Sequence, residues 1–328
     1  MKIQAPKNHL VNYLRISVTD RCNLACRYCV PKEFVPLLTH KEIARYEEIF
    51  RIIRLSCDLG ITKVRITGGE PLVRKGIVDF IGKVSKIPDI KDLSITTNGV
   101  LLRKNAYYLK KAGLKRINIS LDTLKPEKFK FITGKDLLKE VWKGIMEVRE
   151  QGFLPIKLNC VLMRGINDDE IEDLASITLD HPFHMRFIEY MPMGNSAVEI
   201  KQQVLIPEIR KRIETAFGPL ESVQKEINDG PAKRFKISNS LGEIGFISPV
   251  SSHFCHECNR LRLTSTGTLR PCLLNSYEKD ILMPLRQGAS DHELKEILLE
   301  TIGKKPNSHT LGQDSSSRIQ SQTFTIGG

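Results

Sequence analysis

The sequence has no long apolar run, and no stretch of its 328 residues approaches the roughly 20 apolar residues that span a bilayer. Residues 1–10 also lack the apolar core and the small-residue cleavage site of a secretory signal. We therefore expect neither a membrane-spanning segment nor export, and a cytoplasmic location follows as the default.

Acidic residues are in the minority, because 38 Asp and Glu residues face 50 Lys and Arg residues, a net charge of +12. This excess favours an anionic partner, such as nucleic acid, an acidic membrane surface or a phosphorylated small molecule. The basic residues are spread along the chain and do not gather in a tail. That distribution favours a nucleotide-like substrate over nucleic acid.

Disulfides are not expected, because the cytosol keeps thiols reduced. Of the eight cysteines, three lie within residues 22–29 and three within residues 255–272. Grouped cysteines in a reducing compartment indicate metal or cluster ligands. The two isolated cysteines, Cys57 and Cys160, are expected to be small buried apolar residues.

Short runs rich in Ile, Val, Leu and Thr recur between residues 13 and 190, with helical patterns between them. Six strands that alternate with helices predict a parallel sheet with right-handed crossovers. A barrel-like sheet of six βα units, short of the usual eight, fits this order, and a doubly wound open sheet is the alternative. The expected strands are 13–18, 63–67, 93–97, 116–121, 156–161 and 185–190.

The clearest helix is expected to begin at Thr39, where Thr39 and Glu42 form a capping-box pattern, and to end before Gly60. Beyond the sixth strand the pattern changes. We therefore divide the chain into a partial barrel over residues 1–220 and a C-terminal region over residues 221–328. Further helices are expected at 135–150, 168–178, 205–217 and 292–301, and short strands within 235–247.

Polar or glycine-rich groups follow one expected strand after another. In a barrel the carboxyl ends of the strands meet at one mouth, where catalytic groups collect. The pattern therefore predicts an active site at this mouth. The groups are the cysteine loop, Gly68-Gly69-Glu70-Pro71, Thr97-Asn98-Gly99, Ser120-Leu121-Asp122, Asn159 and residues 189–191.

The first cysteine group, Cys22, Cys26 and Cys29, has C-x₃-C-x₂-C spacing on one short loop. Three thiolates can hold three irons of a [4Fe–4S] cluster and leave the fourth iron open to a small molecule. Zinc is the competing interpretation. A structural zinc site needs four ligands, however, and the nearest histidine, His40, lies on the next expected helix. The spacing favours the cluster.

The second cysteine group consists of Cys255, Cys258 and, after 13 intervening residues, Cys272. His253 and His256 lie nearby in the sequence. A zinc site with three cysteines and one histidine is therefore a real alternative to a second cluster. The spacing alone does not decide between them.

The first cysteine group, the preceding segment 17–21 and the Gly68-Gly69-Glu70-Pro71 loop resemble the radical S-adenosylmethionine (SAM) superfamily. Within it, the second cysteine group and its surroundings resemble the GTP 3′,8-cyclase family of molybdenum-cofactor biosynthesis. The resemblance covers essentially the whole chain. The segments that carry it are 186–191, 245–249, 254–263, 269–273, Lys304-Lys305-Pro306 and Ile326-Gly327-Gly328.

This resemblance implies an α/β fold, an incomplete (β/α)6 TIM-like barrel with a C-terminal extension that carries a second [4Fe–4S] cluster. It implies a lyase that acts in the first step of molybdenum-cofactor biosynthesis. A 5′-deoxyadenosyl radical from SAM removes the hydrogen at C3′ of GTP, and the C3′ radical adds to C8 of the guanine. The product is (8S)-3′,8-cyclo-7,8-dihydroguanosine 5′-triphosphate.

The resemblance also implies roles for individual residues. One cluster is held by Cys22, Cys26 and Cys29, and the other by Cys255, Cys258 and Cys272. SAM is bound by Tyr28, Gly68, Gly69, Glu70, Ser120 and Met191. GTP is bound by Arg15, Arg65, Thr96, Lys157, Arg260, Leu261 and Arg262. Catalysis depends on Arg15, Arg260, Arg262 and the terminal Gly327 and Gly328, which reach into the pocket.

The implied partners are GTP as substrate, a reducing electron donor and a downstream cyclic pyranopterin monophosphate synthase. Neither a membrane nor a nucleic acid is expected, and the chain is expected to be a monomer or a homodimer. Two other hypotheses stay open. One is a radical SAM enzyme with an auxiliary cluster that modifies a peptide. The other, more remote, is a zinc-containing protein that binds nucleic acid.

Overall fold

The computed structural model describes residues 4–5, 9–30, 37–193, 198–224 and 230–308. No helix in these ranges is long and apolar enough to cross a membrane. The predicted catalytic residues Gly327 and Gly328 lie outside the described residues.

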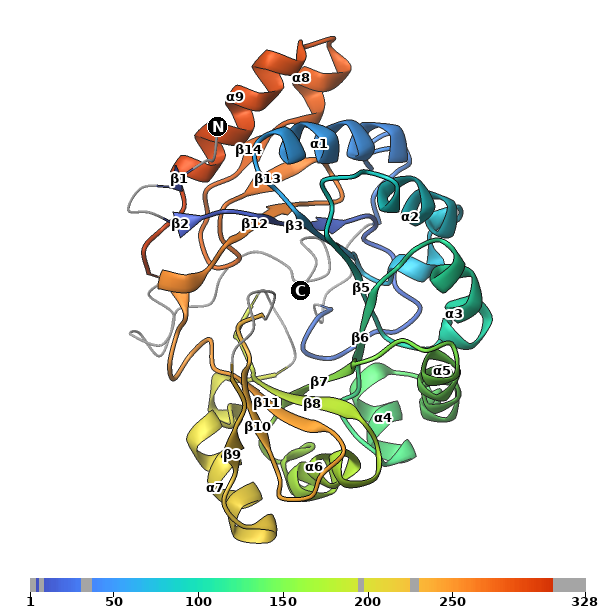
Figure 1. Ribbon diagram of the computed structural model, residues 1–328, viewed down its shortest axis with the longest axis vertical. Coiled ribbons are helices and arrows are strands. Elements are labelled where there is room, and N and C mark those ends of the chain that lie inside the picture. The colour runs from blue at the N-terminus through green and yellow to red at the C-terminus, as the bar shows by residue number, and fades with distance from the viewer. Residues whose placement is uncertain (1–3, 6–8, 31–36, 194–197, 225–229, 309–328) are drawn as a thin grey trace.

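Six parallel strands form the centre of the sheet, and each lies beside the next strand along the chain. In Figure 1 they follow one another around an arc. This arrangement confirms the predicted series of six βα units. The strands are β3 (Tyr13–Ser17), β4 (Lys63–Thr67), β5 (Asp92–Thr97), β6 (Arg116–Ser120), β7 (Ile156–Leu162) and β8 (Phe183–Glu189).

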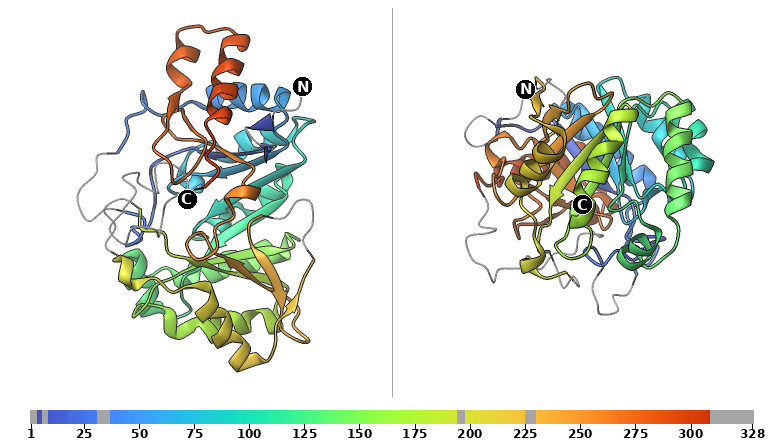
Figure 2. Two further views of the ribbon diagram at one scale, coloured as in Figure 1. Left: turned by 90° about the vertical axis from the view of Figure 1, so that its left-hand side faces the viewer. Right: turned by 90° about the horizontal axis from the view of Figure 1, so that it is seen from below.

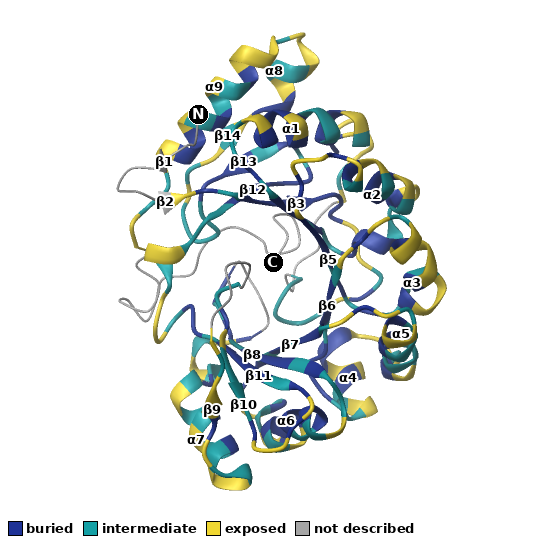
Figure 3. Ribbon diagram, in the orientation of Figure 1, coloured by how far each residue is buried: buried dark blue, intermediate teal, exposed yellow. Residues whose placement is uncertain are grey.

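The helices between these strands cover the convex side of the arc and turn their buried faces toward the sheet (Figures 1 and 3). A doubly wound sheet would carry helices on both faces. The fold is therefore the incomplete barrel. The helices are α1 (Tyr46–Asp58), α2 (Ile77–Ser85), α3 (Leu102–Lys111), α4 (Pro126–Thr133), α5 (Leu138–Glu150) and α6 (Ile171–Asp180). Short 3₁₀ turns are η1 (Pro71–Val73), η2 (Asp168–Glu170), η3 (Ile200–Gln202) and η4 (Cys255–Glu257).

The C-terminal region extends the same sheet at both edges. At one edge β11 (Glu243–Ile247) pairs in parallel with β8, and β10 (Lys233–Lys236) and β9 (Glu221–Ser222) follow antiparallel. At the other edge β12 (Arg260–Leu263) pairs in parallel with β3. The antiparallel strands there are β13 (Thr268–Arg270) and β14 (Lys279–Asp280).

Helix α7 (Ile206–Phe217) follows β8, and the last helices are α8 (Leu282–Arg286) and α9 (Asp291–Gly303). Figure 2 shows α8 and α9 standing beside α1, so the end of the described chain returns to its beginning. Two short strands, β1 (Gln4–Ala5) and β2 (His9–Leu10), pair only with each other in the described part of the chain.

The predicted start of the first helix at Thr39 is wrong. Thr39 and Glu42 do form the expected hydrogen bond, 2.7 Å between the hydroxyl and the carboxylate, but it closes a separate turn. The Ala44 N–H then donates to the carbonyl of Ser265 at 2.8 Å. This bond attaches the backbone at Ala44 to the C-terminal region, so the N–H is not used in a helix. Helix α1 therefore begins at Tyr46. The helices predicted at 135–150 and 168–178 each begin three residues later in the structure than predicted, at Leu138 and Ile171.

Alternation along the strands separates an apolar face from a polar one. Leu14, Ile16, Val64 and Ile66 are fully buried against the helices. Cys160 and Cys57 are buried in the same core, as predicted. Because strand side chains alternate, the neighbouring residues of each strand face the inside of the barrel.

Candidate active site inside the barrel

A cavity inside the barrel is lined by the inward residues of β3 to β8 and β12. The strand register aligns them, since Arg15 lies between Arg262 on β12 and Arg65 on β4. Six of the seven residues predicted to bind GTP line this cavity: Arg15, Arg65, Thr96, Lys157, Arg260 and Arg262.

The seventh predicted residue, Leu261, points the other way. Its side chain is buried in the apolar core, because strand alternation places it on the face opposite Arg260 and Arg262. A contact of Leu261 with a ligand in the cavity can therefore come only from its backbone.

The cavity is strongly cationic. Eight Lys and Arg side chains line it, whereas Asp92 and Glu257 are the acidic residues among the described lining. Asp92 forms an ion pair with Arg116, so its negative charge is already balanced. The eight are Arg15, Lys63, Arg65, Arg116, Lys157, Arg186, Arg260 and Arg262.

This crowding costs electrostatic free energy. Burial, with the charge of Arg262, holds the pKa of Arg15 well below its usual value, and burial likewise lowers the pKa of Arg65. Burial and the nearby Arg260 lower the pKa of Arg262 to about 10. An anionic ligand would relieve this repulsion, so the cavity suits a molecule with several negative charges.

Three buried polar atoms on the same wall have no hydrogen-bond partner among the described residues. They are the hydroxyls of Tyr13 and Thr96 and the side-chain oxygen of Asn159. Buried polar groups are almost always paired in native proteins. Their position in the cavity wall indicates a polar ligand.

Sequence reasoning missed three of the lining cations: Lys63, Arg116 and Arg186. Lys63 lies two residues before Arg65, so strand alternation alone would have placed both on the inner face. Arg186 lies within the segment 186–191 that carries the family resemblance. Arg116 lies four residues before Ser120 in the strand predicted at 116–121, so the same alternation places it on the inner face.

The second cysteine group lines the same cavity. Cys255 and Cys258 bracket the turn η4 ahead of β12, and Cys272 follows β13. Although burial opposes it, the positive charges of Arg260 and Lys305 lower the pKa of the Cys258 thiol. The surroundings thus favour a thiolate, which is the form that binds iron or zinc.

Neither histidine of the zinc alternative lines this cavity, and the side chains of His253 and His256 are exposed. In the part of the chain that the structure describes, no group of three or more His, Cys, Asp or Glu side chains is placed to hold a single metal ion. In a cubane each thiolate binds a different iron, so its ligands need not converge on one point. The donor set fits a cluster better than a zinc ion.

The first cysteine group lies on the loop after β3 and is anchored to the end of α4. The Ala25 and Arg27 N–H groups donate to the carbonyls of Thr133 and Ile132, both at 2.9 Å. Burial and the neighbouring thiol of Cys22 raise the pKa of Cys29 to about 12. Buried thiols that repel one another as thiolates ionise together only beside a positive group, which fits the irons of a cluster.

Gly69 packs directly against the loop that carries Cys22. A Cβ atom at this position would lie 2.4 Å from the carbonyl oxygen of Arg21. The Gly69 N–H donates to the carbonyl of Thr19 at 2.7 Å. Gly68 is also tightly packed, with a hypothetical Cβ 2.8 Å from the same Thr19 oxygen. Both glycines therefore set the position of the cysteine loop.

Glu70, predicted to contact SAM, uses its carboxylate within the protein. It accepts hydrogen bonds from the Thr97 hydroxyl at 2.8 Å, the Leu72 N–H at 2.9 Å and the Asn98 N–H at 2.7 Å. Burial raises its pKa to about 7. The Asn98 amide in turn approaches the Cys22 sulfur at 3.7 Å. Asn98 is therefore a neighbour of the cysteine loop. From the sequence it is expected only to follow the end of a strand.

Tyr28 lies between two cysteines and reaches the end of β6. Its hydroxyl donates to the buried carboxylate of Asp122 at 2.8 Å, and the other carboxylate oxygen accepts from the Val161 N–H at 2.9 Å. Ser120 is half-buried two residues before Asp122, and Met191 lines the cavity. Tyr28 therefore belongs to the first cysteine loop and Gly68 and Gly69 pack against it, whereas Met191 lines the cationic cavity.

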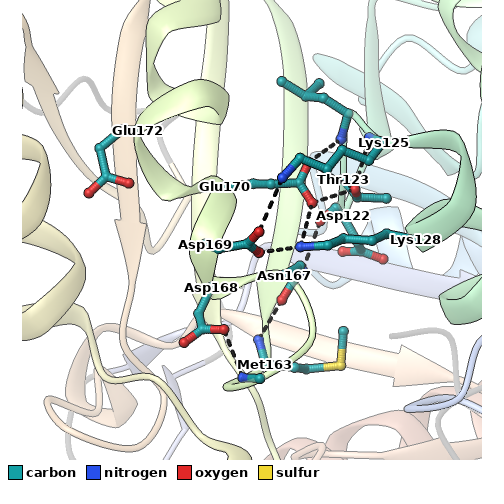
Figure 4. Close-up of polar contacts among 12 residues, drawn as sticks. Asp122, Thr123, Lys125, Lys128, Met163, Asn167, Asp168, Asp169, Glu170 and Glu172 are labelled. Carbon is teal, nitrogen blue, oxygen red and sulfur yellow. Dashed lines mark hydrogen bonds and ion pairs between the residues drawn. The ribbon is translucent and has the colours of Figure 1, made fainter.

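Figure 4 shows how the loop after β6 is held against the loop after β7. The Asn167 amide donates to the backbone carbonyl of Asp122 at 2.8 Å. Glu170, fully buried, accepts hydrogen bonds from the Thr123 hydroxyl at 2.7 Å and the Leu124 N–H at 2.8 Å. This network is a support for Asp122 and therefore for Tyr28.

Two family matches divide the chain. Residues 16–177 match the radical SAM superfamily, and residues 183–311 match the family described as Molybdenum Cofactor Synthesis C. The chain is also similar over its length to curated proteins named GTP 3′,8-cyclase. The relative from Thermodesulfovibrio yellowstonii is 48% identical over 98% of each chain. That from Moorella thermoacetica is 48% identical over 91% of this chain and 92% of the relative.

Among solved structures, the chain resembles SuiB from Streptococcus suis bound to S-adenosylmethionine. The TM-score is 0.62 at 17% identity, and the match covers 91% of this chain and 67% of SuiB. At this identity the likeness concerns the fold alone, and it agrees with the incomplete barrel described above.

Proposed function

Because the chain belongs to the GTP 3′,8-cyclase family of radical SAM proteins, we propose that its cationic cavity binds GTP and that the chain catalyses the 3′,8-cyclisation of this nucleotide. One observation carries the proposal. Six of the seven predicted GTP residues and all three cysteines of the second group line a single cavity. A guanine beside the cysteines and a triphosphate among the cations would fill such a site.

Two [4Fe–4S] clusters and SAM are the cofactors. The first cluster is assigned to Cys22, Cys26 and Cys29, and the second to Cys255, Cys258 and Cys272. When bound, they supply the 5′-deoxyadenosyl radical that removes H3′ of GTP and an iron site that faces the guanine.

The cations of the cavity hold the triphosphate. Arginine pairs with phosphate oxygens through two parallel N–H donors, and lysine acts as a point charge. We assign these roles to Arg15, Arg65, Arg260, Arg262 and Lys157, and we add Lys63 and Arg186 on the strength of their places in the lining. The Thr96 hydroxyl, which has no partner among the described residues, would bind a ribose or phosphate oxygen.

The chief catalytic task of this chain is to position the reacting atoms of GTP. Hydrogen abstraction by a carbon radical needs no acid–base pair, but C3′ must lie near the attacking carbon and C8 near C3′. Arg15, Arg260 and Arg262 surround the cavity on adjacent strands, which suits them to fix the nucleotide in one orientation. Gly327 and Gly328 are proposed to complete the pocket.

SAM is assigned to the space beside the first cysteine loop, with Tyr28, Ser120 and Met191 as contacts. Gly69 and Glu70 support this space, because their hydrogen bonds fix the backbone of residues 19–21 and the end of β5. Gly68 contributes through its close approach to Thr19. The reaction belongs to the lyase class.

We further propose a functional division at residues 220 and 221, a cytoplasmic location, and a monomeric or homodimeric state. A reducing compartment suits thiols that must stay free to hold clusters. The chain would accept electrons from a reducing donor, and its product would pass to a cyclic pyranopterin monophosphate synthase.

The test is anaerobic iron and zinc analysis of the reconstituted chain and of a Cys255→Ala variant. We expect about eight irons per chain, falling to about four in the variant, with no zinc. A Cys57→Ala variant serves as the control and keeps about eight irons. Four irons with one zinc would overturn the second cluster, and iron-free protein would overturn the radical mechanism.

A further inference from the structure

Lys305 lies just beyond α9 and reaches into the hairpin that carries the second cysteine group. Its ammonium donates to the backbone carbonyl of Arg260 at 2.8 Å and to that of Pro271 at 2.8 Å. Arg260 comes two residues after Cys258, and Pro271 directly precedes Cys272. One side chain therefore joins the two segments that bring these cysteines together.

The hairpin needs such a link at this place. Strands β12 and β13 pair through Leu263 with Leu269 and through Arg262 with Arg270, and the pairing ends there. The next residue, Pro271, has no N–H and cannot donate to a continued ladder. The Lys305 ammonium supplies donors to both strands just past the last pair.

The position of Lys305 is fixed by the preceding helix. Helix α9 is anchored in the core through Leu294, Leu298 and Ile302, which are buried. The Lys305 N–H donates to the carbonyl of Ile302 at 3.1 Å. The side chain is half-buried, whereas the neighbouring Lys304 is exposed. The ammonium is thus held in place by a folded element and does not sample the solvent freely.

We propose that Lys305 is a positioning residue for the second cluster, which holds the Cys258 and Cys272 segments together and raises the reduction potential of the cluster. The inference rests on the proposed function, since it assumes a cluster on Cys255, Cys258 and Cys272. Reduction adds a negative charge to a cluster, and a fixed positive charge beside a ligating sulfur stabilises the reduced form.

The Lys305 ammonium also hydrogen-bonds the Cys258 thiol, and the Arg260 guanidinium places a second positive charge near this sulfur. Arg260 also lines the cavity, so it is expected to serve the substrate as well as the sulfur. Lys305 does not line the cavity, and its ammonium bonds the backbone of the cysteine segments.

The test isolates the second cluster in the full chain with Cys22→Ala, Cys26→Ala and Cys29→Ala. Lys305→Met, Lys305→Arg and the matched control Lys304→Met are added to this background. Each protein is reconstituted with iron and sulfide, and its potential is titrated anaerobically by electron paramagnetic resonance. At the midpoint potential of the parent, we expect Lys305→Met to lower the ratio of reduced to oxidised cluster at least about threefold. Lys304→Met should leave it unchanged, and Lys305→Arg should lie closer to the parent.

Equal potentials for Lys305→Met and Lys304→Met would overturn the proposal. If Lys305→Met loses the second cluster, the same change is made with all cysteines present. Retention of the first cluster and recovery of the second by Lys305→Arg then support the positioning role. Loss of both clusters, together with a lower unfolding temperature, overturns it. A parent without Cys22, Cys26 and Cys29 that binds no iron would instead contradict the proposed function.

Discussion

The Tyr28 hydroxyl donates a 2.8 Å hydrogen bond to the carboxylate of Asp122, 94 residues further along the chain. The bond joins the first cysteine loop to the end of β6. The second oxygen of Asp122 holds the Val161 N–H of β7. A single buried carboxylate therefore fixes the aromatic ring beside the cluster site relative to two strands of the barrel.

Replacing Asp122 with Asn should weaken SAM binding without unfolding the chain. The amide keeps the size of the carboxylate but loses its charge and one acceptor, so the Tyr28 ring is held less firmly. We expect the dissociation constant for SAM to rise on the order of tenfold. Equilibrium binding to the reconstituted protein measures it, and iron content should stay at the parental value.

Tyr28→Phe provides the matched test, because it removes the same bond from the other side. If the two residues act through this bond, the double variant should bind SAM about as weakly as either single variant. Fully additive losses would show that Asp122 and Tyr28 act independently.

Gly69→Ala should remove the first cluster and spare the second. The new methyl group would lie 2.4 Å from the Arg21 carbonyl, so the cysteine loop must shift. Iron should fall by about four per chain. Gly82→Ala is the control, since a Cβ there lies 3.8 Å from its nearest neighbour, within α2, where Ala is the better helix former. Full iron content in Gly69→Ala would argue against this role of the loop.

Replacing the two adjacent threonines of β5 should affect different properties: Thr96→Val the binding of GTP, and Thr97→Val the stability of the fold. Thr96→Val removes a hydroxyl that has no partner among the described residues, so we expect KM for GTP to rise several-fold with no loss of stability. Thr97→Val removes the donor to Glu70 and should lower the free energy of unfolding by about 1 kcal/mol. Steady-state kinetics measures KM for GTP, and chemical denaturation measures the free energy of unfolding, for both variants. Equal KM values for Thr96→Val and the parent would show that the Thr96 hydroxyl does not bind GTP.

Glu48 links α1 to the C-terminal helix α8 and makes stability depend on pH. Although burial alone would raise it, hydrogen bonds from Arg286 and Arg45 hold the pKa of Glu48 at about 2. A carboxyl group with a lowered pKa stabilises the fold above its unfolded value of 4.5, and this contribution is lost as the pH falls toward 2. Glu48→Gln should therefore cost about 2 kcal/mol at pH 7, and the cost should shrink below pH 4.5.

Denaturant titrations at pH 7 and pH 3.5 measure this difference. Asp58→Asn is the control, because it removes an exposed ion pair between α1 and Lys295 of α9. We expect a change below about 1 kcal/mol for this variant. A cost for Glu48→Gln that is the same at both pH values would contradict the assignment.

The sequence predicts the six central strands to within two residues at each end, because local side-chain alternation governs them. It fails at the start of α1, where a long-range bond from Ala44 to Ser265 overrides the local signal of Thr39 and Glu42. The cluster cysteines and most of the proposed GTP contacts are recognisable from spacing and family resemblance.

Other features of the site depend on contacts between distant segments. Lys305 reaches the cysteine hairpin only because α9 packs beside it. The Glu70 carboxylate is a further case, since its partners on β5 and in the following turn cannot be read from the Gly-Gly-Glu-Pro motif.

Removal of H3′ from GTP by radical SAM chemistry is the step on which the proposed function depends. The most direct measurement is incubation of the reconstituted protein with SAM, dithionite and GTP that carries deuterium at C3′, followed by mass spectrometry of the 5′-deoxyadenosine. We expect 5′-deoxyadenosine that contains deuterium, released only when GTP is present and absent with a Cys26→Ala variant. Release that does not depend on GTP, or 5′-deoxyadenosine without deuterium, would contradict the proposed function.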